Sequence, residues 1–181
     1  MKKYLFIIIT VLIVNSLSLA QFTKEKNYIG PSIGLYFHGS TPIWGANYEY
    51  AMPTNVGPGT LGIGGLLRYW SWSTDGGYYG GESWGWDYSD FMIGAQANYH
   101  FIVGDGKVDP FAGLTLAYDI GSVSYKGSSS YPHSEPSWGG MFLGLNGGCR
   151  YWFSNSWSGV VRLGFGSSSF SVIDIGADYK F

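Results

Sequence analysis

The sequence contains a single cysteine, few charged residues and no block of basic residues. Cys149 has no second cysteine to pair with, so the chain is not a disulfide-stapled scaffold. Charged residues make up 12% of the chain, well below the share of about 25% in soluble domains. The lack of a basic cluster argues against a nucleic-acid partner. We expect Cys149 to act as a small apolar side chain rather than as a reactive thiol.

Long apolar runs are also missing beyond the first residues. A membrane-spanning helix needs about 20 apolar residues, and the one apolar run, Tyr4–Val14, is too short. Two lysines precede this run and small residues follow it up to Ala20, which is typical of a secretory signal peptide. We predict a signal peptide over residues 1–20, cleaved after Ala20, and one exported domain over residues 21–181. Because Gln21 is not a cysteine, we do not expect a lipoprotein.

Glycine and aromatic residues are abundant instead, with 29 glycines and 19% aromatic residues. Without the two lysines of the signal peptide, the chain carries 8 basic and 12 acidic residues, a net charge of −4. Few charges, many aromatics and many glycines in an exported protein favour a β-barrel whose outer face contacts lipid. The length of the exported part suits a single domain.

The last twelve residues, 170–181, show the underlying pattern. Successive strand side chains point to opposite faces, and here one face is apolar while the other is polar and charged. A terminal aromatic residue with apolar residues at alternate positions before it resembles the last strand of outer-membrane barrels, which the insertion machinery reads. We therefore expect Phe181 and Tyr179 to form an assembly signal, the alternative being an ordinary half-buried strand. The apolar face carries Ile173, Ile175, Ala177, Tyr179 and Phe181, and the polar face carries Val172, Asp174, Gly176, Asp178 and Lys180.

The same alternation recurs along the chain and predicts eight strands of about the length that a tilted membrane crossing requires. Open strand edges are too costly in lipid, so we expect the last strand to pair with the first and close a cylinder. The predicted strands cover residues 29–38, 44–50, 61–70, 91–101, 112–120, 141–153, 157–165 and 172–181. The predicted connections are Gly39–Pro42, Pro53–Gly59, Ser71–Ser89, Gly104–Lys107, Tyr125–Ser137, Ser154–Ser156 and Gly166–Ser169.

Alternation alone does not say which face lies inside, because a soluble lipocalin-like barrel turns its apolar face inward. Here the polar face is too weakly charged for a soluble exterior, it is rich in small residues that suit a narrow lumen, and aromatics gather at strand ends as in a membrane girdle. We therefore place the polar face inside. Because buried charges must pair, we expect a lumen charge network, and packing is favoured over a narrow water-filled channel. The expected members are Glu49, Arg68, Asp119, Arg150, Arg162, Asp174, Asp178 and Lys180.

Aromatic residues are densest between residues 70 and 88. Exposed Trp and Tyr side chains could stack on sugars or anchor a protein partner. The favoured alternative is that the two flanking strands extend beyond the membrane as a hairpin with cross-strand aromatic pairs. The possible surface-contact residues are Trp70, Trp72, Tyr78, Tyr79, Trp84, Trp86 and Tyr88. The nearby acids show no metal-ligand spacing, and we expect neither a metal nor another cofactor.

Histidine chemistry offers little support for an enzyme. Some eight-stranded barrels modify lipid A with Ser and His residues, and the one comparable group here is His133-Ser134-Glu135. Catalysis needs a rigidly oriented nucleophile and base, which a Ser/Gly/Pro-rich loop does not supply. His38 and His100 fall at lumen-facing positions, where we expect neighbouring groups to satisfy them. We therefore predict no catalytic residues.

The whole exported part resembles the small eight-stranded outer-membrane barrels of the OmpA/OmpX type. The resemblance is carried by the alternating segments 97–101 and 148–153, by Asp109-Pro-Phe-Ala-Gly113, and by the terminal Tyr179-Lys-Phe181. It implies an all-β, eight-stranded antiparallel up-and-down transmembrane barrel in the bacterial outer membrane. The implied partners are membrane lipid, lipopolysaccharide and the assembly machinery, with an unidentified extracellular ligand and a monomeric state. We expect a non-enzymatic structural or surface-interaction role, the alternatives being a narrow channel or a lipid A-modifying enzyme.

Overall fold

The protein is all-β in a computed structural model that describes residues 22–36, 41–79, 82–104, 106–127, 139–167 and 171–181. The predicted signal peptide lies outside the described residues. No helix within the described ranges is long and apolar enough to cross a membrane. The strands are β1 (Asn27–Tyr36), β2 (Pro42–Val56), β3 (Gly59–Tyr79), β4 (Glu82–His100), β5 (Val108–Lys126), β6 (Gly139–Trp152), β7 (Trp157–Gly166) and β8 (Ser171–Lys180).

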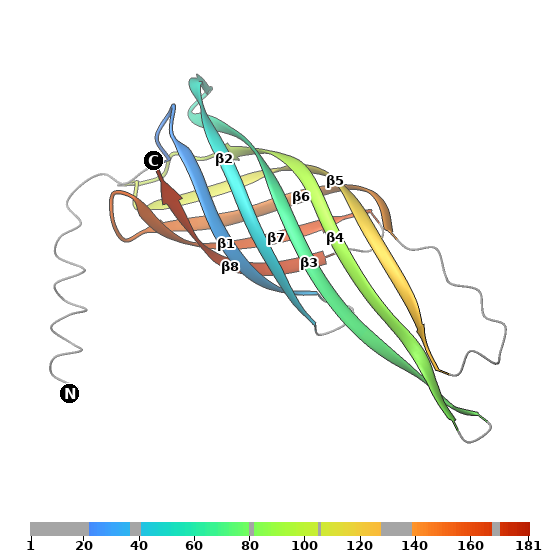
Figure 1. Ribbon diagram of the computed structural model, residues 1–181. Helices are drawn as coiled ribbons and strands as arrows, with labels where there is room; N and C mark the ends of the chain where they lie inside the picture. Colours follow the sequence, from blue (N-terminus) through green and yellow to red (C-terminus); the bar gives the residue numbers. More distant parts are fainter. Residues whose placement is uncertain (1–21, 37–40, 80–81, 105, 128–138, 168–170) are drawn as a thin grey trace, which may run out of the picture.

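The eight strands form one closed antiparallel ring in sequence order. Each strand pairs with its chain neighbours, and β8 pairs with both β7 and β1, as expected for a closed cylinder. The closing seam ends with two backbone hydrogen bonds between Asn27 and Phe181, each 3.0 Å long. The start of β1 and the C-terminus lie at the same end of the barrel, which we call the terminal end (Figure 1). The opposite end is the extension end.

Three of the strands are much longer than a membrane crossing requires. Figure 1 shows β3, β4 and β5 continuing past the other strands at the extension end. The expectation of a loop over Ser71–Ser89 was wrong, because β3 and β4 stay paired from Ser71↔Ser89 to Tyr79↔Glu82, with one register shift between Asp75 and Gly77. The hairpin alternative describes this segment. Glycines suggested a loop, but the Ser and aromatic residues between them alternate and sustain cross-strand pairing.

Two other predicted connections are shorter than expected. β2 continues to Val56 past an irregularity between Ala51 and Asn55, so the turn that was assigned to Pro53–Gly59 reduces to Gly57-Pro58. Gly57 has a φ of 61°, which glycine adopts without strain. A proline is tolerated where a bulge interrupts the ladder. Likewise β5 runs to Lys126, and most of the connection predicted after it lies outside the described residues.

The two faces of the wall have opposite character. Large apolar side chains on the outer face are exposed on every strand, and they form a continuous belt around the barrel. Buried polar and charged side chains point inward. This is the membrane arrangement, in which lipid covers the apolar face. The belt includes Ile29, Ile33, Leu35, Trp44, Ile63, Leu67, Tyr69, Phe91, Ile93, Leu114, Leu116, Tyr118, Ile120, Met141, Leu143, Leu145, Val161, Leu163, Phe165, Ile173 and Ile175.

Candidate functional site

The lumen is filled in three successive layers, which differ in chemistry. An aromatic layer closes the terminal end, a network of charged side chains occupies the middle, and an apolar cluster fills the extension end. Side chains of eight-stranded barrels are expected to fill the interior. Each layer draws on strands from different sides of the ring, so the layers tie the wall together across the lumen.

The middle layer is a continuous ion network. It runs from Arg68 through Asp174, Arg162, Asp178 and Arg150 to Glu49, Asp109 and His100. All eight side chains are at most 8% exposed. Charges this deeply buried are tolerated only when they are paired and hydrogen-bonded. The members come from β2, β3, β4, β5, β6, β7 and β8, so the network braces nearly the whole ring.

Arg150 is the most highly connected member. Its guanidinium contacts Asp178 at 2.7 Å through Nε, Glu49 at 2.5 Å through Nη2 and Asp109 at 3.4 Å through Nη1. Its Cζ also stands 5.3–5.4 Å from the ring centroids of Phe22, Tyr28 and Phe111. A planar guanidinium presents five donors in a fixed fork, and here that fork joins three carboxylates from three strands.

The far end of the network joins opposite walls of the barrel. Arg68 on β3 donates to Asp174 on β8 at 2.9 Å and to Asn47 Oδ1 at 2.9 Å. Arg162 donates to the same Asp174 at 3.3 Å and to Asp178 at 2.9 Å. Each aspartate is therefore shared by two guanidiniums, which satisfies both of its oxygens.

His100 balances the charge of the network. Its Nδ1 lies 2.8 Å from Asp109 Oδ1 and its Nε2 lies 3.0 Å from Glu49 Oε1. Carboxylates only accept hydrogen bonds, so both ring nitrogens must carry hydrogen, and the geometry fits the imidazolium. Four carboxylates then face three guanidiniums and one imidazolium. Neighbouring groups satisfy His100, as expected.

The sequence placed six of these eight groups in the lumen network and missed two. Asp109 is the second residue of β5. In the sequence, the Asp109-Pro110 pair indicated where the strand begins but not that the Asp109 carboxylate joins the network. His100 was placed in the lumen, but its link to the network depends on the stagger between strands, which the sequence does not give. Alternation could have identified Asp109, because it shares the inward face with Phe111 and Thr115.

Two predicted network members are wrong. The Lys180 ammonium stands 4.8 Å from the ring centroid of Trp152 and 3.4 Å from Thr23 Oγ1, beyond the last acid of the network. Asp119 lies at the extension end, opposite Met92 on β4 and Gly140 on β6. Both residues were assigned to the correct face but to the wrong level along the barrel axis.

The terminal end is closed by the segment that follows the predicted cleavage site. Phe22 stacks on His100 with a centroid distance of 3.5 Å and on Tyr28 with 4.6 Å. Backbone N–H of Thr23 donates to the Tyr28 hydroxyl at 2.6 Å, and Glu25 N–H donates to the Ala51 carbonyl at 2.9 Å. The buried cluster of Phe22, Tyr28, Ala51 and Trp152 thus covers the floor of the ion network.

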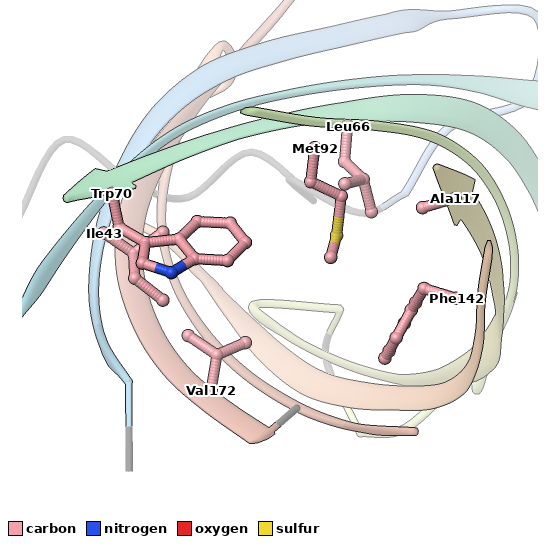
Figure 2. Packing of buried hydrophobic residues seen from close by; sticks show 7 residues of the cluster. All are labelled: Ile43, Leu66, Trp70, Met92, Ala117, Phe142 and Val172. Carbon is pink, nitrogen blue, oxygen red and sulfur yellow. The ribbon is translucent and has the colours of Figure 1, made fainter. Parts of the chain in front are cut away.

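The apolar cluster fills the other end of the lumen (Figure 2). Figure 2 shows the Trp70 indole inside the barrel near Ile43 and Val172, with Phe142 on the other side. Trp70 is only 2% exposed, so its assignment as a surface-contact residue was wrong; even-numbered residues of β3 face inward here. The cluster consists of Ile43, Leu66, Trp70, Met92, Ala117, Phe142 and Val172. A cavity of ≈ 40 Å³ between the cluster and Arg68, Arg162 and Asp174 has room for only a few waters.

The remaining aromatics predicted for surface contact belong to the outer extension, which comprises residues 71–79, 82–89 and 121–126. Trp72 stacks on Tyr88 at a centroid distance of 4.8 Å, and Trp86 meets Tyr125 edge-on at 5.3 Å. Trp84 is 37% exposed. These five side chains continue the inward-facing positions of their strands. Tyr78 and Tyr79 lie in β3, with side chains outside the described part.

The predicted assembly residues form an exposed aromatic group at the terminal end. Tyr179 is 4.9 Å from Trp157 and 6.1 Å from Phe181 by ring centroids. All three side chains belong to the outer face. Among the described residues, no group of three or more His, Cys, Asp or Glu side chains is placed to hold a metal ion. His38 and the His133-Ser134-Glu135 segment lie outside the described residues.

Comparison with known proteins identifies the fold. No family model and no curated protein sequence matches the chain. Among solved structures, the outer membrane protein OprG of Pseudomonas aeruginosa superposes with a TM-score of 0.66 at 12% identity, covering 91% of this chain and 99% of that one. The N-terminal β-barrel domain of P. aeruginosa OprF gives 0.55 at 15% identity, covering 87% and 98%. Yersinia pestis Ail, solved with the heparin analogue sucrose octasulfate, gives 0.54 at 12% identity, covering 88% and 100%.

These likenesses establish architecture, and the two faces of the wall agree with it. An apolar belt covers the outside, paired charges and an apolar cluster fill the inside, and the ring has no open edge. The chain therefore folds as an eight-stranded antiparallel up-and-down β-barrel with the architecture of the small transmembrane barrels of outer membranes.

Proposed function

We propose that the protein is a non-enzymatic, sealed outer-membrane barrel that supports the envelope and contacts its surroundings through the outer extension. The filled lumen is the observation that carries this proposal. A solute would have to displace the Phe22 cluster, break the ion network and pass Trp70 and Phe142. The barrel body therefore acts as a rigid anchor in the membrane. The outer extension projects beyond this body, and we assign the contacts with the surroundings to it.

The orientation follows from the lengths of the connections. Outer-membrane barrels carry short turns on the periplasmic side and longer segments outside the cell. The terminal end has the short turns Gly57-Pro58 and Ser154–Ser156, whereas the strands at the other end extend well past the ring. We assign the terminal end to the periplasm and the outer extension to the exterior. Phe181 and Tyr179 then lie where the assembly machinery acts, which supports their role as its signal.

The aromatic face of the outer extension supports the contact role. Trp and Tyr give large contact areas at low entropic cost, and they dominate many interfaces. Stacked pairs such as Trp72–Tyr88 hold the side chains in fixed positions. Trp84, more exposed than the paired aromatics, is the best placed to meet a partner. We propose an extracellular ligand for this face, without assigning its identity.

Three experiments test the proposal. The purified protein in planar bilayers should show no conductance above a protein-free bilayer, with a known porin as positive control; steady ion-selective steps would support the narrow-channel alternative. Replacing residues 76–85 by Asn-Gly should leave an assembled barrel but abolish binding of whole cells to surfaces or host proteins that the parent binds. Unchanged binding would remove the extension from the proposed role.

Lipid A isolated from cells making the protein should be unmodified, and a modification lost in a His133→Ala variant would favour the enzyme alternative.

A further inference from the structure

The aromatic face of the outer extension is built in three rows that are evenly spaced along β4. Tyr88, Trp86 and Trp84 belong to the first, second and third row, and they are two residues apart on this strand. On β3, Trp72 lies opposite Tyr88 and completes the first row. On β5, Tyr125 lies opposite Trp86 and completes the second row. Because two residues advance about 6.8 Å along a strand, the rings recur at a fixed interval.

Contacts within each row hold the rings in place. In the first row the two rings stack with an interplanar angle of 5°. In the second row they meet edge-on with an interplanar angle of 70°. In the third row a Cβ at Gly76 would collide with the six-membered ring of Trp84, so this indole lies against the glycine backbone. A ligand therefore meets rings that are already ordered, which lowers the entropic cost of binding.

The negative charge of the exported chain is concentrated in the outer extension and at its base. Five of the 12 acidic residues lie there, but only one of the 8 basic residues. The other seven acids and seven bases cancel, so this part accounts for the whole net charge of −4. The acids are Asp75, Glu82, Asp87, Asp90 and Asp119, and the base is Lys126.

The single base lies away from the aromatic face, whereas two acids lie at the floor of this face. Lys126 Nζ is 3.7 Å from Asp87 Oδ1 on the outward side of the sheet. Asp90 is two residues from Tyr88 on β4, on the same side of the sheet, and is 1% exposed. Asp119 Oδ1 is buried and has no hydrogen-bond partner among the described residues. Within the described part of the outer extension, the aromatic face thus carries carboxylates at its floor and no cation.

Aromatic rings above buried carboxylates select a cationic ligand. The face of an aromatic ring is electronegative and attracts a cation that stands over it. An anionic ligand would face the carboxylates without the Arg or Lys partners on which phosphate and carboxylate recognition relies. The row interval adds a second selection, because alternate side chains of an extended peptide also recur at about 6.8 Å. An extended segment with cations at every second residue therefore matches all three rows at once.

We propose that the aromatic face binds an extended basic segment of a protein partner, with arginines at alternate positions over successive rows. Arginine suits the rings better than lysine, because the planar guanidinium stacks on aromatic faces. The innermost arginine lies nearest to Asp90 and Asp119, whose carboxylates accept hydrogen bonds from its guanidinium. The inference rests on the proposed function and specifies the class of its extracellular ligand.

The first test uses the wild-type exported chain in a nonionic detergent and three fluorescently labelled peptides, whose anisotropy gives Kd. One peptide is Arg-Ser-Arg-Ser-Arg, one is the block peptide Arg-Arg-Arg-Ser-Ser, and one carries citrulline, the uncharged analogue of arginine, in place of each Arg of the first. Each exposed cation–π contact changes Kd about 2- to 5-fold. The block peptide aligns two arginines and should bind about 2- to 5-fold more weakly than the alternating peptide. The citrulline peptide loses all three contacts and should bind about 10-fold or more weakly.

The second test removes one ring from each row. The triple variant Trp84→Leu, Trp86→Leu, Tyr88→Leu keeps apolar side chains, and its Kd for the alternating peptide should rise at least about 5-fold. Tyr69→Leu is the matched control, because it removes an exposed ring from the lipid-facing side of β3, and it should keep the wild-type Kd. The folded-band shift on cold SDS gels verifies that both variants are assembled.

Three results would overturn the basic segment as the ligand. An equal Kd for the citrulline peptide would assign binding to neutral stacking, and an equal Kd for the block peptide would show that the rows do not read alternate positions. An unchanged Kd in the triple variant would place the binding elsewhere. Each failure is separable from failure of the proposed function, which shows as conductance or as unchanged surface binding by the shortened hairpin.

Discussion

Replacing Arg150 by methionine should destabilise the barrel more than any other single change in the ion network. Methionine keeps most of the side-chain volume, so the main loss is the guanidinium that contacts Glu49, Asp109 and Asp178. Removing one partner from a buried ion pair costs about 3–5 kcal/mol, because the other charge stays buried without compensation. Three carboxylates lose a partner here, but the penalty does not triple. His100 still contacts Glu49 and Asp109, and Arg162 still contacts Asp178.

We therefore expect a loss of about 3–5 kcal/mol in the free energy of unfolding, a factor of at least about 100 in the ratio of folded to unfolded protein. Urea unfolding in phospholipid vesicles, followed by tryptophan fluorescence and by the folded-band shift on cold SDS gels, measures it. Lys180→Met is the matched control, since Lys180 lies outside the network and stands over Trp152. It should cost about 0.5–1 kcal/mol, the value of an exposed cation–π contact. A cost below about 1 kcal/mol for Arg150→Met would mean that water enters the lumen and would refute the sealed layer.

Three further predictions concern single contacts. A Cβ at Gly62 would collide with the Glu49 carboxylate, so Gly62→Ala should cost about 1–3 kcal/mol, whereas Gly159→Ala meets open space and should be nearly neutral in the same urea assay. Phe22→Ala removes the ring stacked on His100 and Tyr28 and should cost about 3 kcal/mol or more; a change within error would show that the terminal layer does not hold the barrel closed. Deleting Phe181 should reduce outer-membrane assembly in cells far more than Phe153→Ala, although both side chains are exposed; equal assembly of the two variants would contradict the signal role.

The sequence predicted the architecture well because alternation reports directly on the two faces. The apolar set of β8 and the long run of β6 were assigned to lipid, and both are exposed on the outer face. Closure of β8 on β1 followed from the cost of open edges in lipid, and the register confirms it. These inferences need only the two-residue repeat of apolar side chains and the fact that lipid surrounds the barrel wall.

The levels of side chains along the barrel axis could not be predicted in the same way. Asp119 and Lys180 share the inward face with Arg150 and Asp178, yet they lie at opposite ends of the lumen, away from the network. The stagger between strands decides which inward residues meet, and long-range pairing sets that stagger. The loop assigned to Ser71–Ser89 was wrong for a related reason, whereas the favoured hairpin alternative is confirmed. Gly76 and Gly77 indicated a loop, whereas pairs such as Trp72↔Tyr88 and Ser73↔Asp87 extend the ladder.

A spin-label scan along β5, in a Cys149→Ala background that removes the exposed native thiol, tests the orientation of the wall most directly. Labels at Leu114, Leu116, Tyr118 and Ile120 should be accessible to oxygen dissolved in lipid, and labels at Ser122 and Ser124 should switch to a water-soluble relaxation agent. Labels at the alternating inward positions Thr115 and Ala117 should be shielded from both. High accessibility of Thr115 and Ala117 to the water-soluble agent, with Leu114 and Leu116 shielded from lipid, would contradict a sealed barrel that turns its apolar face to the membrane.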